Sequence, residues 1–367
     1  MKKKVLSVLL ASVTVLSLVA CGSSASAPAA AETPAAPAET AAETEAASTE
    51  AADAATTEPE MVFKYAELNS DDNINAKAGY KFAEYVEELS GGRIKIEVYT
   101  ASTLGDEVTC LNALQMGGGT VDFYRGNTNS LSDYGFKKLN LFGLPYIFTS
   151  RDNMWKVLED ENIGQAFLDE GIEAGAGMVG ISYTDEGARN TFTSKEIKSL
   201  ADIKGMKIRV PETTLMMDTM TALGAEPTPI SYSELYSSLQ TGVVDGAENG
   251  YPGYYSNKFY EVAPYYLLDA HTFSPGIILM AEAKWNELSA EDQDLLREAG
   301  QKASDWNKEQ IEAEEKDLEE KLVAEGVTII DCPAEDKAAA QEACKSVWAD
   351  YSEGIESDLD AIVAAQQ

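Results

Sequence analysis

Hydrophobic and polar positions follow two different periods from about residue 61 onward. Residues 62–68 and 93–99 are predicted as strands, the second with apolar residues at every other position. Between them, residues 75–89 repeat apolar positions at helical spacing and end at Gly91-Gly92, which predicts an amphipathic helix. The chain therefore begins its ordered part with a strand, a helix and a second strand.

The same alternation continues through the next 150 residues. Further helices are predicted at 105–116, 213–223 and 231–240, and further strands at 120–124, 178–183, 206–210 and 243–247. Strands that alternate with helices predict α/β lobes with mainly parallel sheets. Ligands of such folds bind at the carboxyl ends of the strands.

One predicted helix is much longer than the others. It covers residues 289–325, with Ser289 and Asp292 as a capping pair and Gly326 as its end. A continuous helix of this length is about 55 Å long, which exceeds the size of one lobe. We therefore expect it to lie across two lobes.

The N-terminus has the pattern of an export signal. Three lysines precede an apolar stretch that ends among small residues at Cys21, as at the lipobox of bacterial lipoproteins, which this segment resembles. We expect a signal peptide at 1–20 and a lipid on Cys21. Residues 22–60 contain no aromatic residue and no positive charge, so 21–60 is expected to be a disordered tether on the outer face of the membrane or in the periplasm.

Charge and composition exclude several function classes. The formal net charge of −34 argues against nucleic acid and anionic membrane surfaces as partners. A single histidine, His271, excludes a histidine-rich metal site, and no nucleophile stands beside a base, so we expect no enzyme, no metal and no cofactor. Cys332 and Cys344 are expected either to pair or to remain free thiols.

Three arginines next to predicted strand ends or tight turns are the candidates for ligand binding. Arg125 follows the strand at 120–124, Arg189 lies in GARNTFT, and Arg209 lies in MKIRVP. A guanidinium group pairs with a carboxylate through two parallel hydrogen bonds and keeps its charge when desolvated. For any one arginine, a surface ion pair is the competing interpretation.

A family resemblance covers nearly the whole globular part. The segment 205–249 holds, in order, Arg209-Val210-Pro211, LGA, PTP, SELY, GVVDG and Asn249, and it resembles the extracytoplasmic solute receptors of sodium-coupled TRAP transporters. The segments SGGRIKIEVYTASTLGDE, LFGLPYIF, GARNTFTS and KWNELSAEDQ resemble the same family.

The resemblance implies a two-lobed periplasmic-binding-protein-like α/β fold with a ligand cleft between the lobes. One lobe is expected at 61–186 plus about 275–314, and the other at 187–274 plus about 315–367. The resemblance implies three kinds of ligand-binding residue. Arg209, Arg189 and Asn249 would hold the carboxylate, and Tyr232 would place its ring against the ligand. Arg125, Asn127, Asn73 and Asn69 would contribute polar groups from the opposite lobe. The implied partners are a small organic acid and the membrane permease subunits.

The substrate itself stays open. Polar residues in the predicted turn at 124–129, together with Asn69 and Asn73, favour a sugar acid such as a uronate or aldonate. The alternatives are a four-carbon dicarboxylate, with Arg125 on the second carboxylate, a keto acid, or a receptor that serves another transporter or a sensor. GAENGYPG departs from the family's usual pattern near Asn249, and His271 is expected to be structural.

Overall fold

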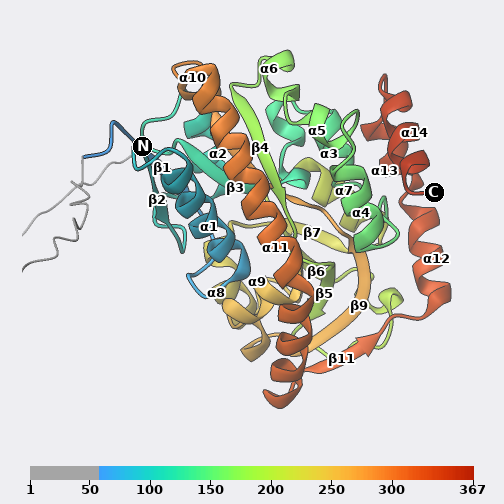
Figure 1. The fold of residues 1–367 in the computed structure, drawn as a ribbon. Helices are drawn as coiled ribbons and strands as arrows, with labels where there is room; N and C mark the ends of the chain where they lie inside the picture. Colours follow the sequence, from blue (N-terminus) through green and yellow to red (C-terminus); the bar gives the residue numbers. More distant parts are fainter. Residues whose placement is uncertain (1–57) are drawn as a thin grey trace, which may run out of the picture. The chain divides into compact units, whose positions relative to one another are not determined.

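Two β-sheets organise residues 58–367, which are the residues that this computed structural model describes (Figure 1). The five-stranded sheet has the order β2 (Ile94–Tyr99), β1 (Met61–Ala66), β3 (Phe123–Asn127), β10 (Gly276–Ala281), β4 (Met178–Thr184). The six-stranded sheet has the order β11 (Thr328–Asp331), β9 (Tyr265–Thr272), β5 (Arg189–Thr193), β8 (Gly246–Asn249), β6 (Lys207–Val210), β7 (Glu226–Pro229). We call each sheet with its packed helices a lobe. The predicted signal peptide, Cys21 and nearly all of the predicted tether lie outside the described residues.

The helices surround these sheets. They are α1 (Ile74–Leu89), α2 (Glu107–Gln115), α3 (Lys138–Leu141), α4 (Arg151–Leu158), α5 (Gly164–Phe167), α6 (Glu170–Ala174), α7 (Thr214–Ala222), α8 (Leu235–Gln240), α9 (Tyr251–Ser256), α10 (Glu282–Trp285), α11 (Ala290–Ala324), α12 (Ala334–Ala343), α13 (Lys345–Tyr351) and α14 (Glu356–Ala365). All the predicted helices are present within a few residues, so the predicted α/β fold class is confirmed.

Each sheet is mainly parallel, as predicted, and each contains one antiparallel strand. β10 runs antiparallel to β3 and β4, and β5 runs antiparallel to β8 and β9. The reason lies in how these two strands are reached. The chain crosses directly from one sheet to the other at residues 185–188 and 273–275, without the helix that a parallel connection requires.

Helix α11 spans both lobes, as predicted. Ser289 caps it by accepting a hydrogen bond from the backbone N–H of Asp292 at 3.1 Å, and its 35 residues make it about 52 Å long. Ala299 and Ala303 pack into the core of the five-stranded sheet, whereas Leu318 packs into the core of the six-stranded sheet. In Figure 1, this orange helix passes in front of strands from both sheets.

The C-terminal helices contact both lobes. Trp348 Nε1 donates to the carbonyl of Pro145 at 2.7 Å, and Gln366 Nε2 donates to that of Ile147 at 2.9 Å. Helix α13 also packs against α7, and α14 packs against α4. The boundaries predicted for the two lobes, with 315–367 in the second, therefore stay a prediction.

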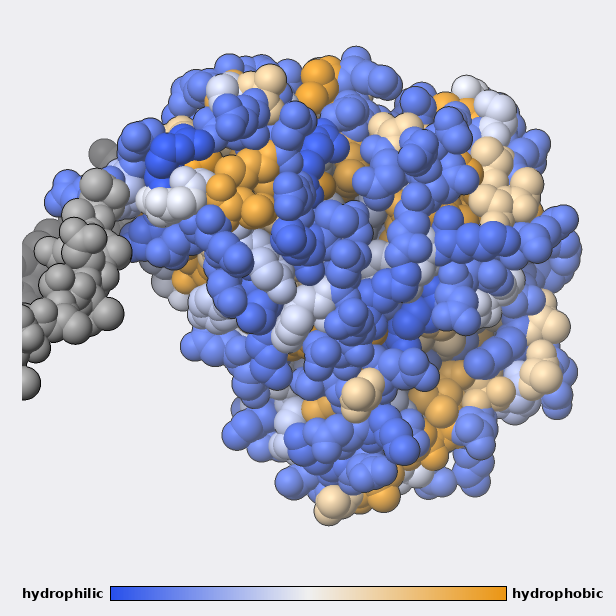
Figure 2. Space-filling view, viewed as in Figure 1, coloured by the Kyte–Doolittle hydropathy of each residue, from blue (hydrophilic) through white to orange (hydrophobic). Residues whose placement is uncertain are grey.

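The face drawn in Figure 2, with α11 in front, is mostly hydrophilic, and apolar residues appear on it only in scattered groups. Within residues 58–367, no helix has both the length and the hydrophobicity that a membrane span requires.

Candidate functional site: a charged cavity between the lobes

A small cavity lies between the lobes, and it offers about 60 Å³ to the centres of water-sized molecules. Seven of the eight predicted ligand-binding residues line it: Asn69, Arg125, Asn127, Arg189, Arg209, Tyr232 and Asn249. Most of them lie near the carboxyl ends of strands, where α/β folds bind ligands. The structure brings these side chains together, and their contact with a ligand stays a prediction.

Arg125 and Asn127 lie within strand β3, which corrects the predicted turn at 124–129. The predicted strand ended at Tyr124, but β3 continues because β10 pairs with it, with Ile278 opposite Arg125 and Gly276 opposite Asn127. The pairing strand is about 150 residues distant in the sequence, so the local pattern gave no sign of it. Both side chains are held by a strand instead of a mobile turn.

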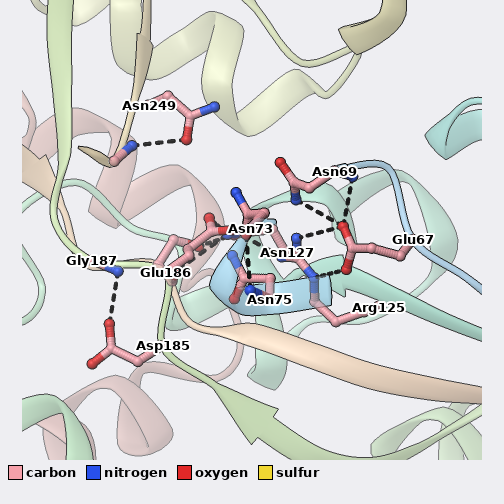
Figure 3. A network of polar contacts seen from close by, with 12 residues as sticks. Glu67, Asn69, Asn73, Asn75, Arg125, Asn127, Asp185, Glu186, Gly187 and Asn249 are labelled. Atoms are coloured by element: carbon pink, nitrogen blue, oxygen red, sulfur yellow. Dashed lines mark hydrogen bonds and ion pairs between the residues drawn. The ribbon is translucent and has the colours of Figure 1, made fainter. Parts of the chain in front are cut away.

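The guanidinium group of Arg125 is occupied by two carboxylates. Its Nε and Nη2 donate to Glu67 at 2.9 and 3.1 Å, and its Nη1 donates to Glu186 at 2.9 Å (Figure 3). All three side chains are buried. Burial alone lowers the pKa of Arg125, but Glu67 and Glu186 outweigh it and raise the pKa.

Arg189 is occupied in the same way. Its Nε and Nη2 donate to the two carboxylate oxygens of Glu248 at 2.6 and 2.8 Å, and its Nη1 donates to Glu186 at 2.8 Å. Glu186 lies in the crossover at 185–188 and joins the two arginines, and it also accepts from Asn127 Nδ2. These ion pairs neutralise Arg125 and Arg189 inside the protein.

Arg209 differs from the other two arginines. Its Nε donates to the carbonyl of Ile230 at 2.7 Å, and its guanidinium carbon lies 5.6 Å from the ring centre of Tyr232. It is only 3% exposed, yet no carboxylate among residues 58–367 lies within ion-pair distance. Burial accordingly lowers the pKa of Arg209. Its two Nη groups are available to a ligand that carries negative charge.

The hydroxyl of Tyr232 connects the two lobes. It donates to Asn69 Oδ1 at 3.2 Å and accepts from the side-chain amides of Asn249 and Asn257 at 3.1 and 3.0 Å. Asn249 Oδ1 accepts from the backbone N–H of Gly250 at 2.8 Å, as Figure 3 shows. Asn249 and Tyr232 thus form part of a cross-lobe contact beside Arg209.

Asn73 is the predicted site residue that the structure places elsewhere. Its Oδ1 accepts from the backbone N–H of Asn75 at 2.8 Å and caps helix α1, while its Nδ2 donates to Ser256 Oγ at 3.0 Å. A helix N-cap is a common role for asparagine. The correction is that Asn73 connects the lobes without lining the cavity.

Sequence reasoning missed several cavity residues, among them Asn75, Asn129, Glu107 and Glu186. The Oδ1 atom of Asn75 and the Nδ2 atom of Asn129 are buried, and neither has a hydrogen-bond partner among the described residues. Glu107 opens helix α2 and accepts from Tyr124 OH at 3.1 Å, and burial raises its pKa. The only indication in the sequence was the polar run Asn127-Thr128-Asn129-Ser130, which contains Asn129. The burial of polar groups is not visible in a sequence.

His271 lies behind the cavity and does not line it. Its Nδ1 is 2.9 Å from Asp269, and its Nε2 is 3.4 Å from the Glu248 oxygen that Arg189 also contacts. Burial alone lowers the pKa of His271, but the carboxylates of Asp269 and Glu248 raise it to about 9. From this position, His271 stabilises Glu248, the carboxylate that pairs with Arg189.

The described residues form no metal-ligand cluster and no disulfide. No three His, Cys, Asp or Glu side chains between residues 58 and 367 are grouped so as to hold a metal ion. Cys110, Cys332 and Cys344 are free thiols. The cavity therefore offers charge, amides and aromatic surface to a ligand.

Comparison with known proteins finds similar proteins in one family. The family model described as bacterial extracellular solute-binding protein, family 7, matches residues 65–354. A solute-binding protein of Chromohalobacter salexigens is 34% identical over 275 residues, which is 75% of this chain and 80% of that protein.

Solved structures of this kind have the same fold. A TRAP periplasmic solute-binding protein from Bradyrhizobium, in complex with α/β-D-galacturonate, matches with a TM-score of 0.77 and 31% identity, covering 83% of this chain and 99% of the other. A second one, from Roseobacter denitrificans with bound L-galactonate, matches with a TM-score of 0.76 and 33% identity, covering 83% and 99%.

Proposed function

Because the chain belongs to family 7 of the bacterial extracellular solute-binding proteins, which are the substrate receptors of TRAP transporters, we propose that it captures a sugar acid outside the cell. The ligand is a monocarboxylate with several hydroxyl groups, such as a uronate or an aldonate. The receptor then delivers it to the membrane subunits of its transporter.

The observation that carries the proposal is the unpaired guanidinium group of Arg209. Among the arginines that line the cavity, Arg125 and Arg189 already hold carboxylates, and Arg209 holds none from the described residues. A ligand carboxylate on its Nη groups would form two charge-assisted hydrogen bonds and compensate a buried charge. The ring of Tyr232 and the amide of Asn249 lie beside that position.

The opposite side of the cavity favours hydroxyl groups over a second carboxylate. Within residues 58–367, Asn75 Oδ1 is an acceptor without a donor, and Asn129 Nδ2 is a donor without an acceptor. A sugar hydroxyl serves as either partner. Glu107 adds a further carboxyl group on this side, which can hydrogen-bond a hydroxyl and offers no positive charge to a second anion.

This charge distribution argues against the dicarboxylate alternative. That alternative needed Arg125 for the second carboxylate, but Glu67 and Glu186 neutralise Arg125. A dicarboxylate would therefore place an unpaired negative charge near Glu107. The galacturonate and galactonate bound by the two similar structures have one carboxylate and several hydroxyl groups.

Binding assays with matched acids test the proposal. Calorimetric titration should show affinity for glucuronate, galacturonate or an aldonate, and weaker affinity for malate and succinate. Arg209→Lys keeps the charge but cannot form both hydrogen bonds, so it should weaken binding by about 2 to 5 kcal/mol. Near-native affinity in this variant would show that the carboxylate binds elsewhere. Ligand recovered unchanged after long incubation would agree with a receptor that is not an enzyme.

We further propose that the mature protein is anchored to the membrane through Cys21. The support is the sequence pattern around Cys21, together with the apolar stretch and the lysines that precede it. In cells that process lipoproteins, the wild type should fractionate with membranes, and Cys21→Ser should appear in the soluble extracytoplasmic fraction. Equal fractionation of both proteins would refute the anchor and leave the binding proposal unaffected.

A further inference from the structure

A second cavity lies beside the ligand cavity, and the proposed function does not use it. By the same measure it offers about 240 Å³, against about 60 Å³ for the ligand cavity. Leu68 and Tyr232 belong to the walls of both cavities. A ligand that extends past these two side chains would therefore enter the second cavity.

The walls of the second cavity combine aromatic rings with neutral polar groups. Tyr236 and Phe259 contribute rings, and the hydroxyl of Tyr236 donates to Glu261 at 2.7 Å, which fixes the orientation of its ring. The Nδ2 atom of Asn257 is used by Tyr232, whereas its Oδ1 accepts from no residue between 58 and 367. Among the described residues, no charged side chain lines this cavity. Such walls suit an uncharged, hydroxylated ring.

A strained turn shapes one wall. Ala101 and Ser102 both adopt the left-handed conformation, with φ of 51° and 56°, which side chains disfavour. The turn is held in place because Ala101 N donates to the carbonyl of Asn69 at 2.8 Å and Ser102 N to that of Glu67 at 3.2 Å. Strained positions of this kind concentrate at functional sites. The wall of the second cavity is thus fastened to the segment that lines the ligand cavity.

We infer that the second cavity is a subsite for a neutral sugar unit attached to the acid, so that the receptor takes disaccharide acids. This inference rests on the proposed function and extends it. The carboxylate binds Arg209, the acid unit fills the small cavity, and the neutral ring stacks on Tyr236. At the wall that the two cavities share, the bond between the two sugar units passes between Tyr232 and Asn69 and breaks their hydrogen bond. The sugar hydroxyl groups next to this bond supply new hydrogen-bond partners to Tyr232 and Asn69.

Calorimetric titration with two matched pairs tests the inference. One pair is gluconate and lactobionate, which is gluconate carrying a galactose unit. The other pair is glucuronate and a disaccharide of glucuronate linked to xylose. For at least one pair, the disaccharide should bind with an affinity equal to or higher than that of its acid unit. If at least one acid unit binds and neither disaccharide binds, the subsite is overturned and the proposed function stands.

Two variants separate the subsite from the ligand cavity. Tyr236→Ala removes the stacking ring, and it should weaken the disaccharide roughly five- to tenfold while the acid unit changes less than twofold. Ser233→Trp should block the disaccharide by filling the cavity without removing packed side chains. Tyr80→Ala, a tyrosine that lines neither cavity, is the control. Equal losses for the disaccharide and the acid unit would overturn the subsite. Failure of every acid and disaccharide to bind would overturn the proposed function and this inference together.

Discussion

The contrast between Arg209 and Arg189 gives the sharpest test of how the site works. Both are buried arginines of the same cavity, but of the two only Arg189 is paired with carboxylates of residues 58–367. We expect the same substitution to have opposite effects at the two positions. Arg209→Met should weaken binding strongly and leave the fold intact, whereas Arg189→Met should destabilise the fold.

The magnitudes follow from the contacts. Arg209→Met loses one hydrogen bond, to Ile230, which costs about 1 kcal/mol. The substitution also removes a buried unpaired cation, which offsets this loss. The free energy of unfolding should therefore stay within about 1 kcal/mol of wild type. Arg189→Met leaves Glu248 and Glu186 buried with fewer partners, which typically costs about 3 to 5 kcal/mol. Binding should weaken by about 2 to 5 kcal/mol in Arg209→Met, or roughly 30- to 5,000-fold.

Two assays on each purified variant decide the matter. Urea unfolding gives the free energy of unfolding without ligand, and calorimetry gives the affinity for the best sugar acid. The reasoning fails if Arg209→Met binds within about threefold of wild type, or if it unfolds as easily as Arg189→Met. In the first case the carboxylate does not bind Arg209, and in the second Arg209 is part of the structural ion pairs.

Three further predictions concern single groups. The pKa of His271 is raised from 6.5 to about 9, so its contribution to stability is fully present below pH 6.5 and is lost as the pH rises through about 9. In urea unfolding, the free energy of unfolding should therefore fall between pH 6 and pH 9.5 by about 3 kcal/mol more in the wild type than in His271→Gln. An equal fall in both proteins would refute this. Glu107→Gln removes a carboxyl group from the cavity and should improve malate relative to glucuronate roughly tenfold in calorimetry, whereas an unchanged ratio would show that Glu107 does not face the ligand. Gly250→Ala would place a Cβ atom 2.4 Å from the backbone oxygen of Glu186 and should cost about 1 to 3 kcal/mol of unfolding free energy, unless the crossover relaxes at no cost.

The elements that local patterns determine were predicted well, and those that depend on distant partners were not. Helix α11 has its cap, its apolar positions and its terminating glycine within one segment, so the sequence predicted its length and its position across both lobes. Strand β3 was predicted too early, because its last residues become a strand only by pairing with β10. The direct crossovers at 185–188 and 273–275 likewise made β5 and β10 antiparallel.

The site shows the same division. Family resemblance named the arginines correctly as cavity residues, but no sequence pattern showed that Glu67, Glu186 and Glu248 neutralise two of them. These carboxylates come from three different segments of the chain. Asn73 caps helix α1 and Asn75 lines the cavity, although the two residues are only two positions apart in the sequence. Only the backbone geometry at the start of α1 gives them these different roles.

The unequal distribution of charge explains how one ligand can close such a receptor. Arg209 and Asn249 belong to the six-stranded sheet, whereas Asn129 follows β3 of the five-stranded sheet. A ligand shifts the balance between open and closed forms only by binding one form better, so it has to contact both lobes. A simple acid such as acetate could pair with Arg209 but would leave Asn75 and Asn129 without partners. Under the proposed function, we expect a sugar acid to pair with the cation on one lobe and the amides on the other, which would link recognition of its hydroxyl groups to closure of the cleft.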